Sequence, residues 1–184
     1  LFMRWSRPAS PKAALLVVHG YGDHSGRYQH VIDAFAAAGY ATYGIDYRGH
    51  GQASGRRGYV SNFPEYLDDL QASLDLVRQK SPGLPILIVA HSHGCLVTGT
   101  YFTSGRSAPD VKAVVFASPY FQLRIEPSWF QLFQARVVGK VVPFLPVKSP
   151  LTVDQLTHDP AFQAATEKDP LYIQSEERRV GKEC

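Results

Sequence analysis

Four short apolar runs alternate with segments of helical periodicity, and this alternation restricts the fold more than any other feature of the sequence. The runs are AALLVV, ATYGI, ILIVA and VKAVVFA, which begin at residues 13, 41, 86 and 111. Their length and β-branched content predict strands, and their lack of polar alternation predicts burial on both faces. Buried strands separated by helices indicate a mostly parallel sheet covered on both faces, so we expect an α/β fold.

Helices are predicted over residues 27–40, 62–83 and 93–104. The first carries apolar residues at helical spacing and ends at Gly39, which suits a C-cap. In the second, we expect Asn62 to cap the helix and Glu65 to complete a capping box. The stripe that this helix buries is predicted to consist of Leu67, Leu70, Leu74 and Val77.

The composition argues against several classes of function. The net charge is only +3 over 184 residues, and basic residues do not cluster with aromatic ones, so we expect no nucleic-acid partner. Cys95 and Cys184 give neither a disulfide framework nor metal-ligand spacing, so we expect a reducing compartment, no metal and no cofactor. Without a bilayer-spanning run or a signal-peptide pattern, we expect a cytoplasmic protein that is at most peripheral to a membrane.

Residues 86–97, ILIVAHSHGCLV, join a predicted strand to a predicted helix through a serine. A serine hydroxyl becomes a nucleophile when a sharp strand-to-helix turn presents it, and this turn needs small residues two positions before and after. Ala90 and Gly94 meet this need around Ser92, although alanine replaces the first glycine of the usual G-x-S-x-G pattern. The N-terminus of the following helix suits an oxyanion. Ser92 is therefore the candidate nucleophile, and an ordinary serine in a turn is the alternative.

A second segment, HGYG at residues 19–22, follows the first strand. In this strand–turn–helix architecture, the corresponding loop supplies one backbone N–H to the oxyanion hole, and the residue after the nucleophile supplies the other. The candidate donors are therefore the N–H groups of Tyr21 and His93. Taken alone, HGYG is better explained as a tight turn.

Four segments resemble the monoacylglycerol lipase and lysophospholipase family of α/β-hydrolases, in that family's order and spacing. They are VVHGYGDHSGRY, GIDYRGHGQASGRRGYVSNFPEYLDDL, PGLPILIVAHSHGCLV and DPLY, and the resemblance extends over residues 1–173. The sequence departs from the family at Ala90, at His93, where methionine is frequent, and at Ala53, where serine is usual. The resemblance implies an α/β-hydrolase fold with a helical cap and a serine hydrolase that acts on lipid esters.

Neither histidine beside the nucleophile is predicted to be its base, because residues adjacent to it on a sharp turn point away from it. We expect His91 to pack or bond behind the turn, and His93 to line the pocket or support the helix. The resemblance implies structural roles for His19 and His50, which would bond neighbouring loops. His24 is not expected to be catalytic either.

The acid and the base of a triad are expected after later strands, in the order serine, acid, histidine. Past the serine turn the chain has one further histidine, His158, which lies with Asp154 and Asp159 in a proline-rich region without a predicted strand. We interpret these three as surface or cap residues. The family's acid and base are expected beyond the end of this chain, so the chain itself is expected to be inactive.

After Pro119 the strand–helix rhythm stops, and the apolar stretch WFQLFQARVVGKVV follows, with proline-rich chain after it. A second core is the ordinary interpretation of such a stretch. The resemblance implies instead a lid that accepts an acyl chain or touches a lipid surface, lined by Trp129, Phe130 and Phe133. We expect a hydrolase core over 1–119, a cap over 120–173 and a non-native tail over 174–184, because SEERRVGKEC resembles vector read-through.

The favoured hypothesis is a serine ester hydrolase that acts on monoacylglycerol-like or lysophospholipid-like esters through an acyl-enzyme, with no protein partner implied. The alternative is a catalytically inert fragment or a lipid-binding protein with this fold, which the missing acid–base pair favours. A cysteine enzyme that uses Cys95 is a third hypothesis, but its place in an apolar helical stretch indicates a core residue.

Overall fold

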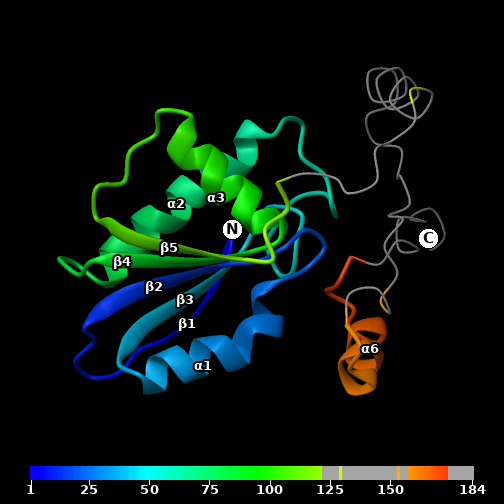
Figure 1. Ribbon diagram of the computed structural model, residues 1–184, viewed down its shortest axis with the longest axis horizontal. Helices are drawn as coiled ribbons and strands as arrows, with labels where there is room; N and C mark the ends of the chain where they lie inside the picture. The colour runs from blue at the N-terminus through cyan, green and yellow to red at the C-terminus, as the bar shows by residue number, and fades with distance from the viewer. Residues whose placement is uncertain (122–128, 130–152, 154–156, 174–184) are drawn as a thin grey trace. The chain divides into compact units, whose positions relative to one another are not determined.

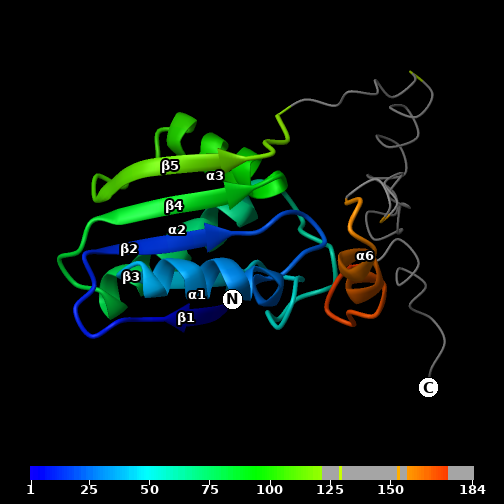
Figure 2. The ribbon, with the colours of Figure 1, turned by 60° about the horizontal axis from the view of Figure 1, so that its bottom comes forward.

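One sheet of five strands organises the part of the chain that the structure describes, which comprises residues 1–121, 129, 153 and 157–173. The structure is a computed structural model. The strand order is β1-β3-β2-β4-β5, in which β1 runs antiparallel to β3 and the other neighbours are parallel. The strands are β1 (Phe2–Ser6), β2 (Ala13–Val18), β3 (Tyr40–Asp46), β4 (Ile86–His91) and β5 (Val111–Ala117). The arrowheads of β2, β4 and β5 reach the same edge of the sheet (Figure 2).

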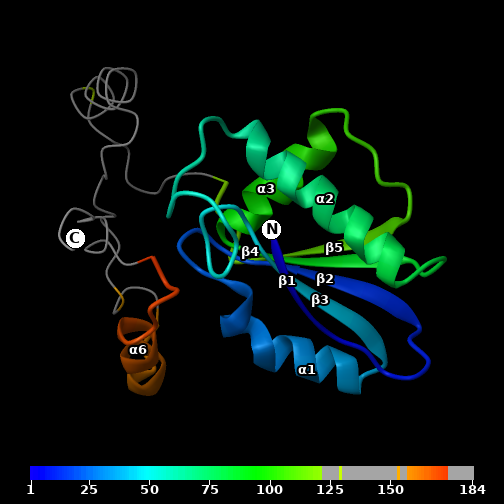
Figure 3. The same cartoon turned by 180° about the vertical axis from the view of Figure 1, so that it is seen from behind.

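Helices cover the two faces of this sheet, as Figures 1 and 3 show from opposite sides. On one face lies α1 (Gln29–Ala37), preceded by the short 3-10 helix η1 (Ser25–Tyr28). On the other face lie α2 (Pro64–Lys80) and α3 (His93–Thr103). The predicted α/β fold, with a mostly parallel sheet between helices, is therefore confirmed. The predicted stripe of α2 is also buried, at Leu67, Leu70, Leu74 and Val77.

The ends of the helices agree with the predictions in one case and differ in the other. Gly39 follows α1 with a φ of +91°, the left-handed conformation expected of a glycine C-cap. The capping box at α2 is wrong, because the N-cap residue is Phe63 and no side chain caps the helix. Instead, Glu65 accepts hydrogen bonds from the Ser61 hydroxyl and from the guanidinium of Arg48. The ion pair with Arg48 thus replaces the predicted contact between this carboxylate and the backbone of Asn62.

Strand β5 differs from the other parallel strands because it forms an edge of the sheet. Val115 is 56% exposed and Phe116 is 41% exposed, whereas β2 is buried throughout. The prediction of strands covered on both faces therefore fails at β5. The main-chain N–H and C=O groups along its outer side have no neighbouring strand within the described residues.

Residues 157–173 belong to a separate part of the chain and are described by themselves. They contain α6 (Pro160–Glu167), which Asp159 caps through a 2.9 Å hydrogen bond from the N–H of Ala161. The candidate cap residue Trp129 is 78% exposed, and Phe130, Phe133, Asp154 and the predicted tail lie outside the described residues. None of the described helices is long and apolar enough to cross a membrane.

Candidate active site

Ser92 stands between the end of β4 and the first residue of α3, and its backbone is strained. Its φ is 51° and its ψ is −116°, in a region that L-residues rarely occupy. A strand that turns directly into a helix requires this conformation, and it exposes the serine side chain at the edge of the sheet. The side chain is only partly buried. The predicted strand–serine–helix turn is thus present in the structure.

Packing explains why small residues stand on either side of Ser92. A Cβ atom on Gly94 would lie 2.6 Å from the carbonyl oxygen of Val18 and 2.7 Å from that of His19, so helix α3 approaches the end of β2 too closely for any side chain. Ala90, which replaces the usual glycine, is fully buried in the main hydrophobic cluster. The extra methyl group is therefore accommodated as part of the core.

The HGYG loop lies directly against Ser92, the candidate nucleophile. A Cβ atom on Gly20 would be 3.2 Å from the Cβ of Ser92, so the main chain of this loop borders the serine. His93 is the first residue of α3, and its N–H has no intrahelical acceptor because of this position. The hydroxyl of Tyr21 donates a 2.8 Å hydrogen bond to the carbonyl oxygen of Gly58, and its ring contacts the ring of His93 edge-on. The HGYG loop and the first residue of α3, which carry the two candidate oxyanion donors, thus both lie next to Ser92.

The two histidines beside the serine have the supporting positions that were expected. His91 lies behind the turn, where its Nδ1 is hydrogen-bonded to the hydroxyl of Tyr28 at 2.8 Å. Burial lowers its pKa. The ring of His93 packs edge-on against those of Tyr66, Tyr21 and Phe63. Burial, followed by the nearby His50, lowers the pKa of His93 to about 4, so its ring is neutral near pH 7.

The remaining histidines of the core also have structural roles. His19 Nδ1 donates to the carbonyl oxygen of Gly20, and its Nε2 accepts a 3.2 Å hydrogen bond from the N–H of Tyr47. His24 caps η1, and His50 donates from Nδ1 to the carbonyl oxygen of Arg48 within its own loop. Burial is the first cause of the lowered pKa of His19 and of the pKa of about 4 at His50. His19 therefore connects its loop to the turn after β3, as the resemblance implied, whereas the hydrogen bond of His50 stays within its own loop.

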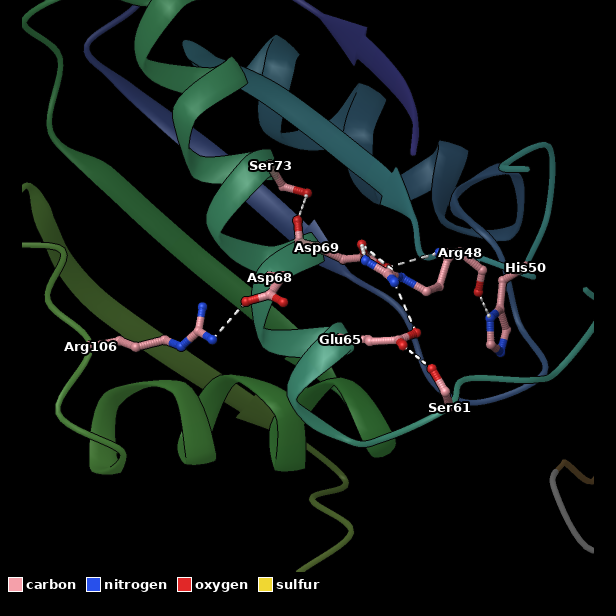
Figure 4. Close-up of polar contacts among 8 residues, drawn as sticks. All are labelled: Arg48, His50, Ser61, Glu65, Asp68, Asp69, Ser73 and Arg106. Atoms are coloured by element: carbon pink, nitrogen blue, oxygen red, sulfur yellow. Dashed lines mark hydrogen bonds and ion pairs between the residues drawn. The ribbon is translucent and has the colours of Figure 1, made fainter. Parts of the chain in front are cut away.

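Sequence reasoning missed an ion-pair network that anchors the glycine-rich turn after β3 (Figure 4). Arg48 donates from Nη2 and Nε to the buried carboxylate of Asp69, at 2.7 Å and 3.0 Å, and from Nη1 to Glu65 at 2.8 Å. Asp69 and Glu65 lie four residues apart on α2, so both carboxylates face the turn. A spacing of E-x-x-x-D after the D-x-R-G-H-G segment was the signal that could have revealed this network.

The described residues do not supply a base to Ser92. None of their side chains hydrogen-bonds the Ser92 hydroxyl, and they hold no group of three potential metal ligands. His158 is exposed, and its neighbour Asp159 serves as a helix cap. Cys95 is fully buried, its thiol donates to the carbonyl oxygen of Ala90, and burial raises its pKa. This environment argues against a cysteine nucleophile.

A strained serine between strand and helix, bordered by a glycine-containing loop at the ends of parallel strands, defines the nucleophile turn of the α/β-hydrolases. The chain belongs to the Hydrolase_4 family, described as serine aminopeptidase, S33, which matches residues 9–184.

Curated relatives of this chain include lipases and a phospholipase. It is 32% identical over 168 residues to the monoacylglycerol lipase of Mycolicibacterium smegmatis, covering 91% of this chain and 59% of that protein. It is 30% identical to the human monoglyceride lipase, covering 93% and 56%, and 28% identical to phospholipase YtpA of Bacillus subtilis, covering 89% and 62%. The chain thus spans 56–62% of the length of these relatives.

Among solved structures, the monoacylglycerol lipase of Paleococcus ferrophilus is similar to this chain. The TM-score is 0.78 and the sequence identity is 25%, over 95% of this chain and 65% of that one. A soluble variant of the Saccharomyces cerevisiae monoglyceride lipase, in complex with a substrate analog, gives a TM-score of 0.75 at 20% identity, over 94% and 59%. These likenesses agree with the fold described above.

Proposed function

We propose that this sequence forms the nucleophile half of a serine hydrolase that cleaves lipophilic carboxylic esters, such as monoacylglycerols or lysophospholipids. The left-handed conformation of Ser92 between β4 and α3 is the observation that carries the proposal. Relatives named monoacylglycerol lipase and phospholipase support the choice of a lipid ester. The substrate is proposed from these names together with the apolar stretch after Pro119.

In the proposed reaction, the Ser92 hydroxyl attacks the ester carbonyl carbon and loses its proton to a histidine base. The N–H groups of Tyr21 and His93 bind the negatively charged oxygen, the alcohol departs after protonation by the same base, and water then releases the fatty acid. The base and its acid are proposed to come from outside the described residues. Trp129, Phe130 and Phe133 are proposed to contact the acyl chain.

A catalytically inert or lipid-binding role for this chain is the second candidate. The observation in its favour is that no side chain in the described ranges hydrogen-bonds the Ser92 hydroxyl. An unassisted serine hydroxyl is a poor nucleophile, so the isolated chain is expected to react slowly.

Hydrolysis by the natural gene product tests the proposal. The substrates are a monoacylglycerol emulsion, a lysophospholipid and an aminoacyl anilide, since the family description includes aminopeptidases. We expect the two lipid esters to be cleaved and the anilide to be spared. Ser92→Ala should abolish this activity, whereas Ser104→Ala, the same change at the end of α3, should preserve it. Equal activity of the two variants would exclude Ser92 as the nucleophile.

A fluorophosphonate probe tests the 184-residue chain itself. We expect weak labelling or none, because the described residues do not provide a base. Rapid labelling that Ser92→Ala abolishes would show that this chain contains its own base, and would remove the inert candidate.

For the intact protein we propose a cytoplasmic location with transient contact to a lipid surface through the segment after Pro119. Cell fractionation checks this, with the expectation that the protein is recovered in the soluble fraction and binds vesicles of neutral lipid reversibly.

A further inference from the structure

Ser118 is the other non-glycine residue with a positive φ in the described ranges. Its φ is 46°, against 51° at Ser92. Each serine follows the last residue of a strand, and those last residues, His91 and Ala117, are paired partners in the parallel strands β4 and β5. Left-handed backbone is unfavourable for a non-glycine residue and persists only where the surroundings hold it. Two such residues at the ends of adjacent strands indicate that the same neighbouring structure holds both of them.

Main-chain hydrogen bonds connect Ser92 to the segment that Ser118 turns back. The N–H of Ser92 donates to the carbonyl oxygen of Ala117 at 3.0 Å, and the N–H of Tyr120 donates to the carbonyl oxygen of Ser92 at 3.3 Å. The N–H of Cys95 donates to that same oxygen at 3.0 Å. Both peptide groups next to the Ser92 Cα are therefore held by neighbouring backbone.

The peptide group between Ser92 and His93 also takes part in the proposed mechanism. Its N–H is the candidate oxyanion donor, and in a trans peptide the N–H and C=O point in opposite directions within one plane. An acceptor bond at the carbonyl oxygen therefore fixes where the N–H points. Hydrogen bonding at the carbonyl also polarises the peptide and strengthens its N–H as a donor.

Side chains fix the same segment to α3. The Phe121 ring lies over Gly99 of α3, where an added Cβ atom would be 3.5 Å from the ring edge. This ring also packs edge-on against Phe116 of β5, with centroids 5.5 Å apart. The thiol of Cys95 contacts the carbonyl oxygen of Ala117 at 3.4 Å. Contacts to α3 therefore hold the segment at both ends.

We propose that residues 117–121, which we term the brace, orient the Ser92–His93 peptide, and that Ser118 is a positioning residue for the oxyanion hole. Ser118 acts through its backbone conformation, which returns the chain so that the Tyr120 N–H reaches the Ser92 carbonyl oxygen. This proposal rests on the proposed function, because an oxyanion hole is needed only if Ser92 is the nucleophile.

The test uses the 184-residue chain with Ser92→Cys and Cys184→Ser, and measures alkylation by iodoacetamide as a function of pH. A thiol at a helix N-terminus has a lowered pKa, so its alkylation rate reports how well the surrounding N–H groups are placed. This reaction needs no catalytic base. Cys95 is buried and is not expected to react, and peptide mass spectrometry assigns the modified site.

In this background, Ser118→Val introduces a β-branched residue that disfavours a positive φ, and Ser118→Gly relieves the strain. We expect Ser118→Val to raise the pKa of the thiol at position 92 and to slow alkylation at neutral pH roughly three- to tenfold. Ser118→Gly should stay within about twofold of the parent. Ser104→Val, at a residue with a φ of −86°, is the matched control and should change nothing.

An unchanged alkylation profile in folded Ser118→Val overturns the proposal. An equal slowing of alkylation in Ser118→Gly or Ser104→Val overturns it as well. If Ser118→Val does not fold, Phe121→Ala decides, since Phe121 is 56% exposed and its ring is the contact with Gly99. An unchanged profile there also overturns the proposal. Ester hydrolysis by the natural gene product is measured separately, so the brace and the proposed function can fail independently.

Discussion

Gly94→Ala tests the close approach of α3 to β2, on which the serine turn depends. The added Cβ atom would lie 2.6 Å from the Val18 carbonyl oxygen, and real Cβ contacts stay above 3.0 Å, so the helix start must withdraw by about 0.4 Å. Overpacking of this kind costs about 1–3 kcal/mol. The better helix propensity of alanine offsets up to about 1 kcal/mol of that cost. We expect a net loss of about 1–2 kcal/mol in the free energy of unfolding.

Gly99→Ala is the matched control in the same helix. Among the described residues, its Cβ atom would meet only the Phe121 ring, at 3.5 Å and 3.9 Å, which is ordinary van der Waals contact. Without a backbone clash, alanine should stabilise the helix by up to about 1 kcal/mol. The assay is urea unfolding followed by circular dichroism, with thermal midpoints as a check, where 1 kcal/mol corresponds to about 2–4 °C for a chain of this length. If Gly94→Ala is as stable as the parent, or as Gly99→Ala, the steric reasoning is wrong.

Three further outcomes are expected in unfolding experiments. Arg48→Lys loses the forked contact with Asp69 and should cost about 1–2 kcal/mol, since the guanidinium is partly exposed to solvent. Tyr28→Phe removes the hydroxyl bonded to His91 and should cost about 1–3 kcal/mol, because the partly buried groups around this hydroxyl lose their hydrogen-bond partner. His93 has a pKa of about 4 in the folded state against an ordinary 6.5, so its contribution to stability should be lost as pH falls from about 6.5 to 4. His93→Met should therefore reduce the slope of stability against pH in that range, by up to about 1.4 kcal/mol per pH unit.

Each of these variants has a matched control. Arg106→Lys changes an ion pair with the exposed Asp68 and should be nearly neutral (Figure 4). Tyr40→Phe tests the loss of a hydroxyl for which no hydrogen bond is found within the described residues, and His30→Met tests the same change at an exposed histidine. Equal effects in a variant and its control would contradict the interactions assigned above.

Local patterns were sufficient to predict most of the core. The strands predicted from residues 13, 41, 86 and 111 occur at Ala13–Val18, Tyr40–Asp46, Ile86–His91 and Val111–Ala117, because continuous apolar and β-branched runs favour parallel strands. The serine turn was predictable for the same reason, since Ala90, Ser92 and Gly94 are adjacent in the sequence.

Features that depend on tertiary contacts were not predictable from the same patterns. The capping box failed because Arg48, 17 residues before Glu65, binds its carboxylate in preference to the helix backbone. The left-handed Ser118 gave no signal, because Ser-Pro is compatible with many turns and its conformation depends on the neighbouring strand. The exposure of β5 was also not predicted from the sequence of this strand, since VKAVVFA has the composition of a covered strand.

Val18 and Ala90 are paired partners in the parallel strands β2 and β4. The HGYG loop begins one residue after the first, and Ser92 lies two residues after the second. A slip of one residue between these strands would move Ser92 along Gly20 by about 3.3 Å, farther than a catalytic hydrogen bond tolerates. Main-chain hydrogen bonds of the sheet, which do not depend on the identity of the side chains, therefore set the spacing between Gly20 and Ser92. Such an arrangement suits proteins whose sequences have diverged to 28–32% identity.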